Sequence, residues 1–131
     1  MSYYMSKTIS AKFDKAIELV TEALKNEGFG VLSEIDIQQT LKKKLDVDFR
    51  KYKILGACNP PNAYKALQAE NKIGTMLPCN VIVQEIDENQ VEVAAIDPVA
   101  SMVAVENKEI ANIASEIRTK LERVMSSLKT K

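Results

Sequence analysis

The last quarter of the chain carries the pattern that most constrains the fold. Between Glu106 and Leu128, apolar residues recur three and four positions apart, as they do on one face of an α-helix. These positions are Ile110, Ile113, Ala114, Ile117, Leu121, Val124, Met125 and Leu128. Since the rest of this helix is charged or polar, another layer must cover the apolar stripe, and we expect that layer to be a β-sheet.

A second amphipathic helix is predicted near the N-terminus, over about residues 11–27. Its apolar positions are Phe13, Ala16, Ile17, Val20 and Leu24. Ser10 is the expected N-cap, and Gly28 is expected to end the helix as the residue that adopts the left-handed conformation.

Five segments are typical of β-strands, because they alternate in polarity or are rich in β-branched residues. They cover residues 3–9, 29–37, 52–57, 81–86 and 91–96. Shorter helices are expected over 38–45 and from Asn59-Pro60-Pro61 to about Asn71, where an N-cap precedes proline.

The sequence therefore predicts one α+β domain over residues 1–131. Its order is strand–helix–strand–strand–strand–strand–helix, with the short helices inserted. We expect a mostly antiparallel sheet of four to five strands, with the two long helices on one face.

Composition excludes several classes of function. Eighteen basic residues balance eighteen acidic ones, so no net charge draws the chain to nucleic acid or to a membrane surface, and neither partner is expected. No apolar run approaches the length of a membrane span. The absence of His excludes imidazole catalysis and His-liganded metals. No catalytic motif replaces them, so whether the chain is an enzyme stays open.

The two cysteines are too few for the disulfide framework of a secreted domain. The N-terminal residues also lack the charged start and apolar run of a signal peptide. We therefore expect a cytoplasmic, reducing location and free, metal-bound or transiently oxidised thiols.

Each cysteine begins a Cys-Asn pair at the end of a predicted strand, next to proline. Cys58 lies between a strand and a helix start, where the positive helix end favours thiolate. Cys79 lies just before the next strand. If the two strands are antiparallel neighbours, both thiols lie at one edge of the sheet. A parallel crossover would separate them by about 17 Å, and spacing alone does not decide between these arrangements.

Gly-Ala-Cys-Asn-Pro at 56–60 and Leu-Pro-Cys-Asn-Val at 77–81, together with residues 28–36 and Asp97-Pro98, closely resemble the family called domain of unknown function 302. The resemblance covers essentially the whole chain. It implies a TATA-binding-protein-like fold: a strand, a helix, a curved antiparallel sheet and a closing helix. The antiparallel arrangement is thereby favoured, while DNA binding does not follow from the fold. The family has no settled activity, so the resemblance implies a fold and a site but no reaction.

The leading hypothesis is a thiol-based site at Cys58 and Cys79 that binds a metal, a small-molecule ligand or an oxidant. Asn59 and Asn80 would orient the site, and Glu34 could supply a carboxylate.

In the metal version, two thiolates and carboxylates from Glu34, Asp36 or Asp97 would hold zinc, although the usual Cys-x-x-Cys spacing is missing.

The alternative is an interaction module in which both cysteines are only packed. The chain would then dimerise through the open face of its sheet. A homodimer is expected under either hypothesis, because two long helices can cover only one sheet face.

Overall fold

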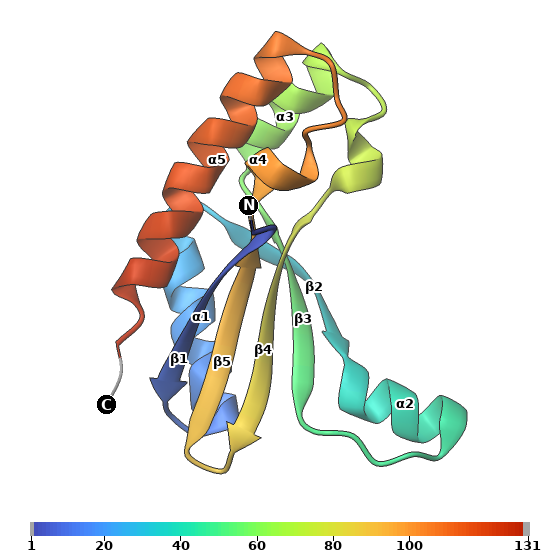
Figure 1. Ribbon diagram of the computed structural model, residues 1–131, viewed down its shortest axis with the longest axis vertical. Coiled ribbons are helices and arrows are strands. Elements are labelled where there is room, and N and C mark those ends of the chain that lie inside the picture. Colours follow the sequence, from blue (N-terminus) through green and yellow to red (C-terminus); the bar gives the residue numbers. More distant parts are fainter. Residues whose placement is uncertain (1, 130–131) are drawn as a thin grey trace.

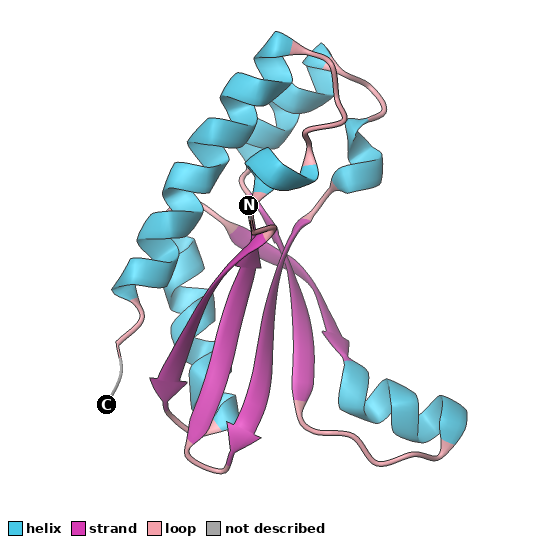
Figure 2. Cartoon of the chain, in the orientation of Figure 1, coloured by secondary structure: helices cyan, strands magenta, loops and turns pink. Residues whose placement is uncertain are grey.

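The computed structural model describes residues 2–129, which form a five-stranded antiparallel sheet flanked by helices (Figures 1 and 2). In chain order the elements are β1 (Tyr4–Ser10), α1 (Phe13–Asn26), β2 (Gly30–Asp36), α2 (Ile37–Leu45), β3 (Tyr52–Cys58), α3 (Pro60–Ala69), the 3₁₀-helix η1 (Ile73–Met76), β4 (Cys79–Asp87), β5 (Gln90–Ile96), α4 (Pro98–Ser101) and α5 (Lys108–Ser127). The strands lie side by side in the order β1-β5-β4-β3-β2. The predicted α+β class is confirmed, as is the antiparallel arrangement of the two cysteine-bearing strands.

Alternation along the strands gives the sheet two different faces. Leu55, Val81 and Ala95 lie opposite one another on β3, β4 and β5, and all three are fully buried. The helices α1 and α5 cover this face, and α1 lies behind the strands in Figure 1. No helix within residues 2–129 covers the other face, which is turned toward the viewer in Figure 1.

The structure confirms the predicted end of α1 but not its predicted start. The prediction that Ser10 caps this helix is wrong: Ser10 ends β1, and α1 begins at Phe13 without a side-chain cap. Ser10 instead pairs with Gln90 of β5 as a strand residue. Gly28 ends the helix as predicted, with φ of 83°. Its N–H donates to Lys25 O, and the N–H of Phe29 donates to Leu24 O, which is the Schellman arrangement.

The predicted C-terminal stripe is confirmed in α5, a helix of 20 residues. The α5 positions of the stripe, from Ile110 to Met125, are buried against the sheet and its neighbouring helices. Asn107 caps the helix, since its side chain accepts hydrogen bonds from the N–H groups of Glu109 and Ile110. Within residues 2–129, no helix combines the length and the apolar character needed to cross a membrane.

The short helices gather at opposite ends of the sheet. The helices α3 and α4, η1 and the start of α5 lie at the upper end in Figure 1, whereas α2 projects from the lower end. The helix α4 was not predicted, although Asp97 caps it and Pro98 occupies its first turn. This helix adds a wall to the end of the sheet where both cysteines lie.

Candidate functional site

The two cysteines lie at the same end of the sheet, on neighbouring strands. Cys79 begins β4 and faces Ala57 of β3, and Cys58 is the next residue of β3. Neither forms a disulfide. Cys79 is buried, and Cys58 is half-buried.

Asn59, which follows Cys58, forms hydrogen bonds with two helices. Its side-chain oxygen accepts a hydrogen bond from the N–H of Asn62 and so caps α3. Its amide donates to the carbonyl of Glu27 at the end of α1. Asn59 is therefore held by backbone groups of two different helices.

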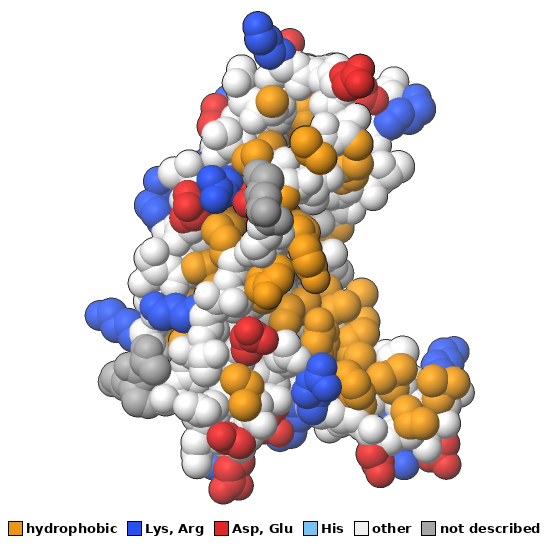
Figure 3. All heavy atoms as spheres, viewed as in Figure 1, with side chains coloured by type: hydrophobic (Ala, Val, Ile, Leu, Met, Phe, Trp, Pro, Cys, Tyr) orange, Lys and Arg blue, Asp and Glu red, His pale blue; other side chains and the backbone are white. Residues whose placement is uncertain are grey.

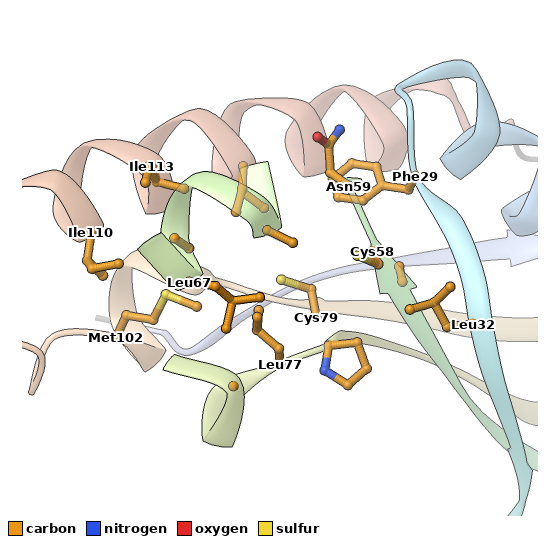
Figure 4. A pocket seen from close by; sticks show the side chains of 16 residues that line it. Phe29, Leu32, Cys58, Asn59, Leu67, Leu77, Cys79, Met102, Ile110 and Ile113 are labelled. Carbon is orange, nitrogen blue, oxygen red and sulfur yellow. The ribbon is translucent and has the colours of Figure 1, made fainter. Parts of the chain in front are cut away.

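A cavity of about 340 Å³ opens beside the cysteines (Figure 4). Sixteen residues from β2, β3, α3, η1, β4 and α5 and from the segments between them line it. They are Phe29, Leu32, Ala57, Cys58, Asn59, Ala63, Ala66, Leu67, Gly74, Leu77, Pro78, Cys79, Met102, Ile110, Ile113 and Ile117. No charged side chain is among them, and Asn59 is the single amide. We call this space the apolar cavity.

The electrostatics of the apolar cavity keep Cys79 protonated. Burial raises the pKa of the Cys79 thiol from 9.0 to about 11, and the neighbouring Cys58 adds to the shift. Cys79 is 5% exposed, so little water is available to solvate a thiolate. At neutral pH this thiol is therefore neutral, whereas both metal binding and nucleophilic attack require thiolate.

Two of the predicted site residues lie away from the apolar cavity. Asn80 follows Cys79 directly on β4, so it points to the opposite face of the sheet, where it is exposed. There it borders a separate hollow with Tyr4 and Tyr52. Glu34 does not line the cavity and instead forms an ion pair with Lys53, at 3.2 Å.

The other two candidate carboxylates act in helix capping. Asp36 accepts a hydrogen bond from the N–H of Gln39 and caps α2. Asp97 is buried, caps α4 and forms an ion pair with Arg118, at 3.1 Å. Within residues 2–129, no three side chains of the His, Cys, Asp and Glu types are grouped so that they could hold a metal ion. The structure therefore does not bring Glu34, Asp36 or Asp97 together with the two cysteines as zinc ligands.

Sequence reasoning placed the thiols but missed most of the cavity wall. Leu67 of α3 and Met102, which follows α4, line the cavity from elements whose packing was not predicted. The Asp97-Pro98 pair, an N-cap followed by proline, is a signal that could have located α4. The isoleucines of α5 were expected in the core, and three of them line the cavity.

Comparisons with known proteins identify the family and agree with the fold. The family described as domain of unknown function DUF302 matches residues 5–128. No curated protein matches the chain. The chain is similar to the crystal structure of an uncharacterized conserved DUF302 protein from Bacillus stearothermophilus, with 26% identity and a TM-score of 0.88. That similarity covers 96% of this chain and 98% of the other. The chain belongs to the DUF302 family.

Proposed function

We propose that the chain binds a small, neutral, mainly apolar molecule in the apolar cavity. The observation that carries the proposal is the lining of this cavity, which contains two thiols and one amide but no charge. Ligand pockets in proteins are mostly apolar, with a few polar groups that fix orientation. At about 340 Å³, this one lies at the small end of their range of roughly 300–1,000 Å³.

The state of Cys79 favours ligand binding over the other two chemistries considered for the thiols. Zinc needs deprotonated sulfur, and oxidants react with thiolate faster than with thiol. The raised pKa of Cys79 opposes both. A neutral thiol in a cavity wall instead acts as a small, polarizable apolar surface.

The position of Asn59 supplies the polar element of the proposed site. Its amide already bonds the backbone of Asn62 and Glu27, so its orientation does not depend on a ligand. A ligand would therefore meet a preformed wall. A reducing compartment such as the cytoplasm would keep both thiols free, as this proposal requires.

Two fluorescent probes that differ by one charge test the proposal. N-phenyl-1-naphthylamine is neutral, and 8-anilino-1-naphthalenesulfonate carries a sulfonate on a related skeleton. Since no cation lines the apolar cavity, we expect fluorescence titration to show saturable binding of the neutral probe and affinity about tenfold weaker or worse for the sulfonate.

A matched pair of substitutions in α3 locates the binding site. Ala63 lines the cavity and Ala69 does not, and both are half-buried. We expect Ala63→Leu to fill the space and weaken binding of the neutral probe about tenfold or more, while Ala69→Leu leaves it unchanged. Far-ultraviolet circular dichroism checks that both variants fold. Equal affinities in the two folded variants, or preferential binding of the sulfonate, would contradict the proposal.

A further inference from the structure

The face of the sheet opposite α1 and α5 carries an apolar row across four strands. Ile35 of β2 faces Ile54 of β3, Ile54 faces Ile82 of β4, and Ile82 faces Ala94 of β5. The next residues along these strands, such as Leu55 and Val81, point into the helix-covered core. A solvated face of an antiparallel sheet usually carries polar residues, so isoleucines in this row indicate a surface that is covered. We call Ile35, Ile54, Ile82 and Ala94 together the isoleucine row.

The projecting helix α2 extends this apolar surface. Figure 3 shows apolar side chains gathered over the sheet face and continuing onto the projecting arm. Leu45, at the end of α2, is 65% exposed, and Val47 in the following loop is 42% exposed. No residue of α2 is buried, although an isolated helix of 9 residues is only marginally stable in water. Contacts with the rest of its own chain therefore leave every residue of this helix half-buried or exposed.

Opposite charges lie in two segments at the same end of the molecule. Lys43 and Lys44 belong to α2, and Asp87 and Glu88 form the turn between β4 and β5. Both segments lie at the lower end in Figure 1. A two-fold axis parallel to the strands would place the α2 of each copy against the β4–β5 turn of the other.

We propose that a second copy of this chain covers the isoleucine row, with the two copies related by this two-fold axis. The two isoleucine rows pack face to face, and the exposed side of α2 rests on the partner sheet. Lys43 and Lys44 pair with the acidic turn of the other copy, so each dimer has two equivalent charged contacts. This inference does not depend on the ligand proposed for the apolar cavity, which lies on the helix-covered side.

Analytical ultracentrifugation of the full chain tests the apolar part of the interface. We expect the wild type to sediment with the mass of two chains. Ile54→Lys places a charge in the isoleucine row and should convert it to the mass of one chain. Ser115→Lys, on the exposed side of α5, is the control and should remain a dimer. A wild type that stays monomeric from micromolar to millimolar concentration, or an Ile54→Lys variant that folds and dimerises normally, would overturn the proposal.

Reversing the charges of α2 in one variant and of the β4–β5 turn in another tests whether these two segments meet across the two-fold axis. One variant carries Lys43→Glu and Lys44→Glu, and the other carries Glu88→Lys and Asn89→Lys, which leaves Asp87 in its turn hydrogen bond with Asn89 N–H. Each variant alone places like charges in both contacts, so we expect its dimer to dissociate about tenfold more readily. An equimolar mixture restores opposite charges in both contacts and should recover wild-type affinity. Failure of the mixture to recover, with both variants folded, would exclude the proposed pairing.

Discussion

The buried surroundings of Cys79 determine the protonation state of its thiol. It lies where β4 begins, on the helix-covered face, with Ala57 opposite it. Desolvation raises its pKa to about 11 and holds the thiol neutral. The same sulfur at an exposed strand end would titrate near its ordinary value. Burial therefore favours a ligand-contacting role for Cys79 over a reactive one.

This raised pKa makes the contribution of Cys79 to stability depend on pH. Above the ordinary pKa of 9.0 the unfolded thiol loses its proton, while the folded thiol keeps it until about pH 11. The stabilising contribution is therefore complete below pH 9.0 and is lost as the pH rises toward 11. We expect the stability difference between wild type and Cys79→Ala to shrink by about 2–3 kcal/mol across this interval.

Urea unfolding of both proteins at several pH values measures this difference. Taking the difference between wild type and variant cancels the titration of lysines and tyrosines that both proteins share. A stability difference that stays constant from neutral pH to pH 11 would show that Cys79 is not desolvated in the folded state.

At the scale of elements, the end of α1 is in direct contact with the start of α3. Gly28 has φ of 83°, and Asn59, which caps α3, donates to Glu27 at the end of α1. A Cβ added at Gly28 would lie 3.2 Å from the amide nitrogen of Asn59. The conformation of Gly28 and the position of Asn59 are therefore coupled.

Gly28→Ala tests whether the left-handed conformation of Gly28 stabilises the fold. We expect a loss of about 1–2 kcal/mol in the free energy of unfolding, because an L-residue is strained in the left-handed conformation. Gly30→Ala is the matched control, since an added Cβ there meets nothing within 4 Å. Its change should stay within about 0.5 kcal/mol. Urea denaturation compares the two, and equal losses would remove the backbone argument for Gly28.

The elements were largely predictable because their signals are local. The period of the α5 stripe, the proline that follows Asn59 and the glycine that ends α1 each act within a few residues. The start of α1 was misplaced because Ser10 is used in pairing with β5, a contact between residues far apart in sequence. The register shift between Val31 and Ser33 of β2 is likewise a property of two paired strands, which no local pattern reveals.

At the scale of the whole molecule, the site was only partly predictable. Antiparallel pairing places Cys58 and Cys79 at one end of the sheet, and strand alternation alone sends Asn80 to the other face. The apolar cavity itself depends on how α3, α4 and α5 pack over the end of the sheet. Residues such as Leu67 and Met102 join it only in three dimensions.

The two proposals assign ligand binding and self-association to opposite faces of the sheet. The helix-covered face contains the core and, at its upper end, the apolar cavity. The open face contains the isoleucine row and continues onto α2. If both proposals hold, each activity can be altered without the other, and we expect Ile54→Lys to leave affinity for the neutral probe unchanged. Fluorescence titration of that variant measures this separation, and a parallel loss of probe binding would contradict it.

The methyl resonances of methionine test ligand binding in the apolar cavity most directly. Met102 lines the cavity, whereas Met5 and Met125 do not. In protein labelled with ¹³C at the methionine methyl groups, titration with N-phenyl-1-naphthylamine should shift the Met102 resonance saturably and leave the resonances of Met5 and Met125 in place. Saturable binding of the probe with no change at Met102 would place it elsewhere and contradict the proposed function.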